Sequence, residues 1–589
     1  MRTIIKSLSI SPELEKEICC PTCFSLYKLS DAPWLCSYKK SKQARPCGEK
    51  LFETKGLYQG ICDKGKSQKY PSLLKNLLPS EIGHLRNIYV TQRLSSWLSW
   101  FLSKSTIEDK IHNWSKELSQ STMNKIHDIQ QSPAWKEMTW PDSPSTGPAP
   151  LDLLVSLFIN WFNPQSNRKR GAQQSFGVLS FNCLNLPPSL RNLIQNTCVA
   201  GITPGPNGPD MMTISHILKA VVDDLLLLEH GDVVGMRKVA GYASHSAILY
   251  CSWCWAKSTN TNRIQIKKLR TKDEVIGAAN RSKAAVSLHQ KDIILKETGV
   301  HWLEFTQLTY RNLVTHLPLG IMHNWFEGVL HHHFRFYWGF VIYTNEVKAN
   351  MKRKRRGIEA ENQGGHLRKQ IVYEEGGGNA LDEEDSDLDK ESESCDFEPN
   401  IKLKTGWDSG LFLKEDIVFF RERLRDVVLP TSISRLPFNL GDSNHGTLKA
   451  AQWHSLFAYI ILLIILKLYI SNVDQLQRDS NRGQILLNIG CLCQCTNIVC
   501  AKKAGEYEAH QFENFYGRYH ETSKRIFQKP TIKPNHHYAL HIPNQIRFWG
   551  PLNSVAEFSG ERLIGVLQKI KTNSHLGKCF PDYLTCWSC

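Results

Sequence analysis

The stretch that decides the fold class is LDLLVSLFI at residues 151–159, which runs directly into NWFNP at residues 160–164. A nearly continuous apolar run that ends at Asn and Pro is typical of a buried strand entering a turn. A second strand is predicted at 175–186, and a helix at Ile214–Leu228. Two strands followed by a helix predict an α/β or α+β sheet.

Composition changes divide the rest of the chain around this core. Val90, Leu94, Trp97 and Phe101 recur at helical spacing ahead of the Ser/Gly/Pro-rich linker SPSTGPAP. After the core, the chain is predicted to be mainly helical, with loops at 430–446 and 529–543. The fold class is therefore multidomain α/β plus α, with these segments: Cys-rich 1–65, helical 66–142, linker 143–150, core 151–347, insertion 348–400 and a helical part at 401–589 that completes the core.

The composition excludes several classes of protein. The chain has 589 residues, 41% of them hydrophobic, and a net charge of +16. These values do not fit a wholly disordered or collagen-like chain, and its 18 cysteines are too dilute for a small disulfide scaffold. A basic chain suits a polyanion such as DNA. The apolar run at 456–470 is interrupted by Lys467 and is shorter than the ~20 residues that span a bilayer, so it predicts a buried core helix and no membrane partner.

The insertion at 348–400 is strongly charged and is predicted to be disordered. It continues through three glycines into a run rich in Asp and Glu between residues 382 and 393. Its basic start indicates either a nuclear localisation signal or an ordinary solvated charge run. The basic residues are Lys352, Arg353, Lys354, Arg355 and Arg356, and a second basic patch, for DNA phosphates, is Arg168, Lys169 and Arg170.

The N-terminal cysteines predict a zinc site. Cys20 and Cys23 have the two-residue gap with which one turn presents two thiolates to a tetrahedral ion. Cys36 and Cys47 form a second pair, ten residues apart, and the alternative is a set of free thiols. Zinc is preferred because this turn-rich segment has little else to hold it folded.

Cys251 and Cys254 form another two-residue pair, but no second Cys pair lies near them. Zinc and a pair of buried thiols are both open interpretations. If a metal binds, the further ligands would be sought at His245, His323 or His331–His333.

Taken one by one, the acidic residues do not define a catalytic site. A two-metal site needs carboxylates that converge from several segments, but the best strand ends in Asn160, an amide. Asp232 has only two valines beside it, and Glu327 lies on a helix-like segment with His323 and His331 along one face, which packing alone would explain.

The order of the motifs is more specific. The chain resembles CACTA-type (En/Spm-like) DNA transposases of fungal type, in the form of a degenerate copy. The resemblance covers most of the chain and rests on these blocks: LFINWFNP at 157–164, SFGV at 175–178, NLPPSLR at 185–191, AGITPGP at 200–206, RKVAGYASH at 237–245 before the second Cys pair, MHNWFEG at 322–328, HGTLKAAQW at 445–453, PNHH at 534–537, WGPL at 549–552 and EFSGERLIG at 557–565.

The resemblance implies an RNase H-like catalytic core with two Mg²⁺ or Mn²⁺ ions that cleaves and joins DNA at transposon ends in the nucleus. It places the catalytic acids at Asn160, Asp232 and Glu327, with Glu561 and Glu557 as weaker choices for the third. Asn160 stands where the family has Asp, and the apolar strand expected before Asp232 is missing. We therefore expect a defective enzyme that binds transposon ends or non-specific duplex; the alternatives are a domesticated DNA-binding or nuclear interaction protein and a helical scaffold.

Overall fold

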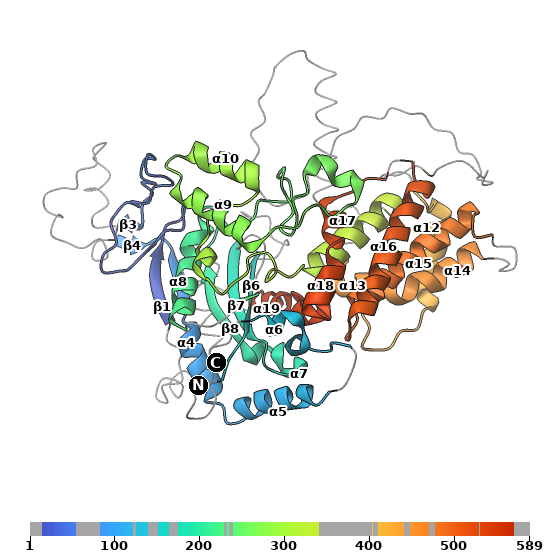
Figure 1. The fold of residues 1–589 in the computed structure, drawn as a ribbon, viewed down its shortest axis with the longest axis horizontal. Helices are drawn as coiled ribbons and strands as arrows, with labels where there is room; N and C mark the ends of the chain where they lie inside the picture. The colour runs from blue at the N-terminus through green and yellow to red at the C-terminus, as the bar shows by residue number, and fades with distance from the viewer. Residues whose placement is uncertain are drawn as a thin grey trace, which may run out of the picture. The chain divides into compact units, whose positions relative to one another are not determined.

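The structure is a computed structural model, and it divides into two compact units (Figure 1). The residues it describes are 14–54, 83–121, 125–138, 151–163, 175–228, 233–234, 240–340, 403, 410–440, 448–470, 477–528 and 530–569. The first unit contains Met1–Val329, Asn497–Asn514 and Thr531–Cys589, and the second contains Leu330–Thr496 and Phe515–Pro530.

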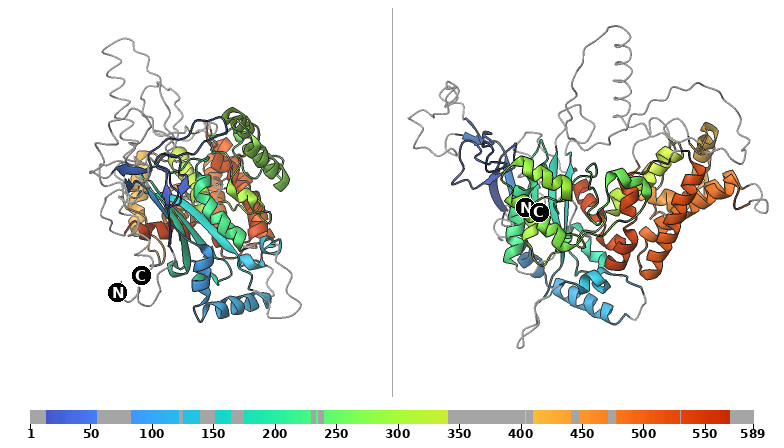
Figure 2. Two further views of the ribbon diagram at one scale, coloured as in Figure 1. Left: turned by 90° about the vertical axis from the view of Figure 1, so that its left-hand side faces the viewer. Right: turned by 45° about the horizontal axis from the view of Figure 1, so that its top comes forward.

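The first unit is built on a seven-stranded sheet with the strand order β2-β1-β5-β8-β7-β6-β9 (Figures 1 and 2). Its neighbouring strands pair antiparallel, except that β9 runs parallel to β6. The strands are β1 (Leu14–Cys19), β2 (Leu26–Tyr27), β5 (Ile88–Gln92), β6 (Val155–Phe162), β7 (Phe176–Cys183), β8 (Thr197–Thr203) and β9 (Val233–Val234). β3 (Phe52–Thr54) and β4 (Gly83–Leu85) form a separate pair.

Residues 155–159 of the apolar run at 151–159 lie on β6, and the second predicted strand is β7. Along β6 the residues at 155, 157 and 159 are buried, whereas those at 156, 158 and 160 are half-buried. Every residue of β7 and β8 is buried, so these two strands are covered on both faces. The chain is therefore mixed α/β, as predicted.

One face of the sheet is covered by α19 (Phe558–Leu567). Leu563, Ile564 and Leu567 of this helix pack in one cluster with side chains of β5, β6, β7 and β8. The contact is close, because a Cβ atom at Gly560 would collide with the ring of Phe158 on β6. α19 therefore brings residues near the end of the chain onto the central strands.

The first unit contains further helices besides α19. α8 (Ile214–Leu227) matches the predicted helix closely, and the carboxylate of its Asp224 accepts hydrogen bonds from the backbone of Leu94 and Ser95 at the start of α4. The others are α4 (Leu94–Leu102), α5 (Ile107–Ser119), α6 (Pro133–Lys136), α7 (Pro188–Arg191), α9 (Lys272–Ala284), α10 (Leu288–Thr298), α17 (Pro534–Ala539) and α18 (Ile542–Trp549), with short 3-10 turns η3 (Ile129–Gln131), η4 (Ile194–Asn196), η5 (Ser258–Arg263), η6 (Glu304–Gln307) and η11 (Leu552–Val555).

Two predictions about these segments were wrong. The stretch around Val90 is strand β5 rather than helix, because Ile88-Tyr89-Val90-Thr91 is a β-branched and aromatic run that pairs with both β1 and β8. The predicted loop at 529–543 contains α17, which starts at Pro534, a residue suited to the first turn of a helix. The predicted linker and the insertion at 348–400 lie outside the described residues.

The second unit is helical in its described residues. It contains η8 (His333–Tyr337), α12 (Lys414–Asp426), α13 (Ala450–Ser455), η9 (Leu456–Ile460), α14 (Ile461–Tyr469) and most of α15 (Asn481–Val499) and α16 (Glu506–Ile526). Its interior is aromatic: Trp338 stacks on Phe457, and Phe334 stacks on Phe340.

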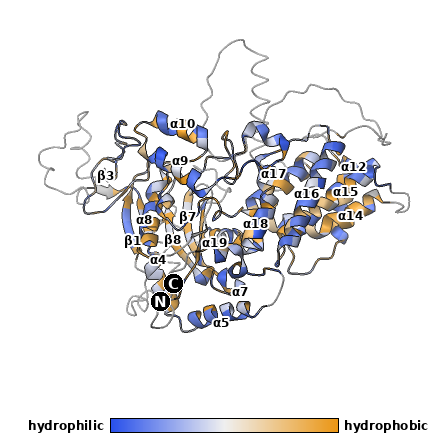
Figure 3. Cartoon of the chain, viewed as in Figure 1, coloured by the Kyte–Doolittle hydropathy of each residue, from blue (hydrophilic) through white to orange (hydrophobic). Residues whose placement is uncertain are grey.

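α13, η9 and α14 together form a helix from Ala450 to Leu468 that is long and apolar enough to cross a membrane, and α14 is mainly hydrophobic in Figure 3. Trp453, Phe457 and Ile461 are fully buried, as expected of a core helix, whereas Leu463 and Leu466 are exposed. One such helix is weak support for a membrane protein, so the absence of a membrane partner stays a prediction.

Candidate metal centres and polar cluster

The four N-terminal cysteines that the sequence singled out lie together. The ligand atoms of Cys20, Cys23, Cys36 and Cys47 are all within 4.8 Å of one another. The Sγ atoms of Cys20 and Cys47 are 3.9 Å apart, and those of Cys23 and Cys36 are 3.3 Å apart. Four thiolates at Zn–S distances of ~2.3 Å would be about 3.8 Å from one another, so this cluster could bind a metal such as zinc.

Backbone hydrogen bonds explain how Cys36 and Cys47, with ten residues between them in the sequence, come close together. The amide of Cys36 donates to the carbonyl of Glu49, and the amide of Gly48 donates back to the carbonyl of Cys36. The amide of Cys47 donates to the carbonyl of Tyr38. Gly48 has φ +71°, a left-handed conformation that glycine adopts without strain, so the loop returns Cys47 to Cys36.

The protonation of this cluster also suits a cation. Hydrogen bonds from the thiols of Cys20 and Cys23, and from the Tyr27 hydroxyl 3.2 Å away, lower the pKa of Cys36. Cys19 is equally buried, but burial raises the pKa of its thiol, and its Sγ donates to the carbonyl of Cys20. The pKa shifts of Cys36 and Cys19 therefore have opposite directions, and the lowered one belongs to the cluster.

Two histidines that were not predicted as metal ligands complete the second Cys pair. Cys251 and Cys254 lie with His537 of α17 and His541, which caps α18, and their ligand atoms are all within 4.8 Å. The Cys251 Sγ is 3.4 Å from His541 Nε2, and the Cys254 Sγ is 3.3 Å from His537 Nε2. Zinc bound by two thiolates and two imidazoles would place S and N about 3.6 Å apart, so this set also fits zinc.

A buried arginine fixes the turn that carries the two cysteines. The Nε of Arg270 donates to the carbonyls of Cys251 and Cys254, and one of its terminal nitrogens donates to the carbonyl of Thr298. Hydrogen bonds from Cys251, His537 and His541 lower the pKa of the Cys254 thiol. All four residues are buried, so solvent does not compete for these ligand atoms.

His245, His323 and His331–His333, which were candidates to complete this pair, are not among the four ligands. His537 lies on α17 and His541 caps α18, so both come from the segment 529–543 that was predicted to be a loop.

A third group gathers around Asn160, which lies near the end of β6. Its Nδ2 donates to Glu561 Oε1 of α19 at 2.5 Å, and its Oδ1 accepts the amide of Trp161. Glu327 and His323 come from η7 (Met322–Leu330), a π-helix. His323 Nδ1 is 2.9 Å from Glu327 Oε2, and its Nε2 is 3.6 Å from Glu561 Oε1.

In this polar cluster one imidazole lies between two carboxylates. Burial by itself would lower the pKa of His323, but the hydrogen bonds to Glu327 and Glu561 raise it to about 10. His323 is therefore a cation between two carboxylates at neutral pH. Glu557 is half-buried and accepts the amide of Met322, and desolvation raises the pKa of its carboxyl group.

The structure brings Asn160 and Glu327 into one cluster, but Glu561 is the acid that Asn160 touches. Asp232 lies outside the described residues, just before β9. The same holds for both basic patches, Arg168, Lys169 and Arg170 and the run Lys352 to Arg356.

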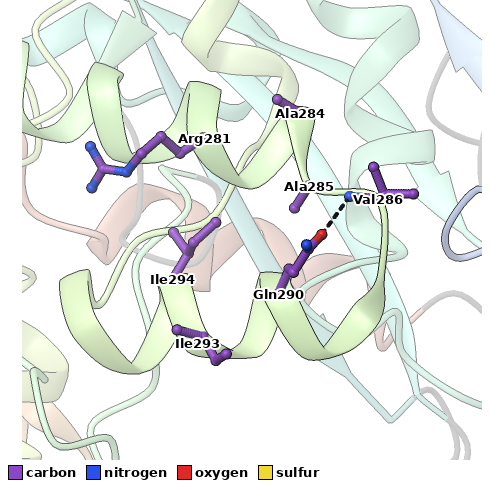
Figure 4. A pocket seen from close by; sticks show the side chains of 7 residues that line it. All are labelled: Arg281, Ala284, Ala285, Val286, Gln290, Ile293 and Ile294. Atoms are coloured by element: carbon purple, nitrogen blue, oxygen red, sulfur yellow. Dashed lines mark hydrogen bonds between the residues drawn. The ribbon is translucent and has the colours of Figure 1, made fainter.

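A shallow hollow of about 450 Å³ opens between α9 and α10 (Figure 4). It is lined by Arg281, Ala284, Ala285, Val286, Gln290, Ile293 and Ile294, and Gln290 closes one side by accepting the amide of Val286. None of the metal-centre or polar-cluster residues lines it, so it is not part of these sites. No known family model matches the chain, and no curated protein matches it either.

Proposed function

We propose that this is a transposon-derived nuclear DNA-binding protein, with an RNase H-like core and two structural zinc sites, whose ancestral transposase centre no longer cleaves DNA. One observation carries the proposal: Asn160 on a central strand is joined to Glu561, and through His323 to Glu327, in a self-contained polar cluster.

The strand order supports the RNase H-like core. β6, β7 and β8 form an antiparallel meander, α8 follows, and β9 then returns parallel to β6. Asn160 lies on the first strand of this meander, and the chain passes Asp232 as it enters β9. The resemblance places the first and second catalytic acids at Asn160 and Asp232, but it expects the strand before Asp232, and β9 follows it.

Glu561 fits the third acid position better than Glu327. It contacts Asn160 directly, from a helix that packs on the same face of the sheet, whereas Glu327 reaches the centre through His323. We therefore assign the ancestral third acid to Glu561 and regard Glu327 as the partner that holds His323.

The residues of this cluster do not fit a pair of divalent cations. Two such ions need several carboxylates, because their charges repel strongly at the ~3.5–4 Å spacing of two-metal sites. Here Asn160 is neutral and turns its N–H toward Glu561, whose carboxylate also lies 3.6 Å from His323.

DNA binding is tested with the full-length, zinc-loaded protein and a fluorescein-labelled duplex, by anisotropy at several salt concentrations. We expect the affinity to fall steeply with salt, because neutralised phosphates release counterions, with a slope of about −0.9 per phosphate contact. Replacing Arg168, Lys169 and Arg170 by Ala should make the slope shallower, whereas the matched change of Lys110, Lys116 and Lys136 should not. Absence of binding at low salt would overturn the proposed function.

A further inference from the structure

The two helices that supply the histidines of the second metal centre also hold η7, the helix that carries His323 and Glu327. From α17, the side-chain Nδ2 of Asn535 donates to the carbonyl of His323 at 3.3 Å, and Asn324 Nδ2 donates to the carbonyl of Asn535 at 3.1 Å. From α18, the side-chain oxygen of Gln545 accepts the amide of Leu319 at 3.2 Å.

In each of these two helices, the side chain that forms the hydrogen bond is close in sequence to a candidate metal ligand. Asn535 is two residues before His537, and Gln545 is one helical turn after His541, whose carbonyl accepts the Gln545 amide at 2.9 Å. The surface of η7 is also shaped to receive Asn535, because a Cβ atom at Gly328 would collide with the Asn535 amide.

These helices are too short to persist on their own. α17 has six residues and α18 has eight, whereas isolated helices below ~12–15 residues are marginal in water. A metal ion on Cys251, Cys254, His537 and His541 would tie both to the turn at Cys251–Cys254, which Arg270 fixes.

We propose that the metal at this second centre positions η7, and hence His323 and Glu327, and that Asn535 is the positioning residue that carries most of this coupling. The proposal rests on the zinc occupancy proposed above, but it does not depend on DNA binding. It assigns the second centre a role in shaping the polar cluster rather than only in holding the C-terminal helices.

The test is amide hydrogen exchange, measured by mass spectrometry on the full-length, zinc-loaded protein, together with its zinc content. Asn535→Ala should keep its zinc and the protection of residues 534–549, but exchange about fivefold faster at 319–330, as expected when one hydrogen bond worth about 1 kcal/mol is lost. His541→Ala should lose one zinc and exchange faster in both segments. The control Asn280→Ala, an exposed side chain on α9, should change neither.

Unchanged protection of 319–330 in Asn535→Ala would overturn the assignment of Asn535. Loosening of 534–549 in His541→Ala, with 319–330 still protected, would overturn the coupling itself. If His541→Ala unfolds throughout, Asn535→Ala decides alone, because that variant keeps every metal ligand. A wild-type protein that contains no zinc would contradict the proposed metal, and loss of DNA binding alone would contradict only the proposed function.

Discussion

At the scale of single residues, the buried pair Arg191 and Asp128 has the largest predicted effect on stability. Both side chains are at most 1% exposed; Arg191 donates to both carboxylate oxygens of Asp128, which also caps η3. Asp128→Ala leaves an unpaired guanidinium in the interior, and should cost about 3–5 kcal/mol of unfolding free energy. Urea denaturation of the wild-type protein and the variant measures this difference in unfolding free energy. The exposed Asp109→Ala on α5 should stay within about 0.5 kcal/mol, and a similarly small loss in Asp128→Ala would contradict the prediction.

His323 gives a prediction about pH. Its pKa in the folded protein, about 10, is above the ordinary value of 6.5. Its contribution to stability is therefore complete below about pH 6.5 and is lost as the pH rises through 10. NMR titration of the imidazole, assigned with His323→Gln, should show a protonated ring at pH 7. Glu327→Gln should lower the midpoint, and a neutral ring in the wild-type protein would show that the cluster is not ion-paired.

At the scale of elements, how far the sequence could predict the structure depended on whether the signal was local. β6, β7 and α8 were predictable because their apolar patterns lie within single elements. The Cys20 to Cys47 cluster was also predictable, since its ligands span 27 residues and need only one returning loop. His537 and His541 were not predictable as ligands. His537 lies 283 residues from Cys254 and His541 lies 290 residues from Cys251, so tertiary packing determines both contacts. Glu561 was named only as a weaker choice for the third acid, because its contact with Asn160 joins residues 401 positions apart.

The two clusters predict the zinc content of the chain. Purified under reducing conditions, the protein should contain two zinc ions, one for each four-ligand cluster. Cys36→Ser and Cys251→Ser should each reduce this to one, measured by elemental analysis. Cys19→Ser is the matched control, because Cys19 is buried next to the first cluster but does not belong to it. Loss of zinc in the Cys19 variant, or none in the others, would contradict the ligand assignment.

At the scale of the whole molecule, the metal centres and the polar cluster all belong to the first unit, although their residues come from both ends of the chain. The first unit is built from Met1–Val329, Asn497–Asn514 and Thr531–Cys589, and the last of these segments supplies α17, α18 and α19. The helix α19 packs on β5, β6, β7 and β8, so residues far apart in the sequence build one core in the first unit.

Cleavage is the function we expect to be absent. The full-length protein should not nick a transposon-end duplex with Mg²⁺ or Mn²⁺, because Asn160 supplies no negative charge where a two-metal site needs a carboxylate. Asn160→Asp should not restore cleavage alone, since the sequence lacks the apolar strand expected before Asp232, and a displacement of ~1 Å can cost 10²-fold in rate. Gel assays of duplex nicking by the unaltered chain and by Asn160→Asp, with Asp232→Ala as control, test this prediction. Metal-dependent nicking by the unaltered chain that Asp232→Ala abolishes would show that the centre is still active.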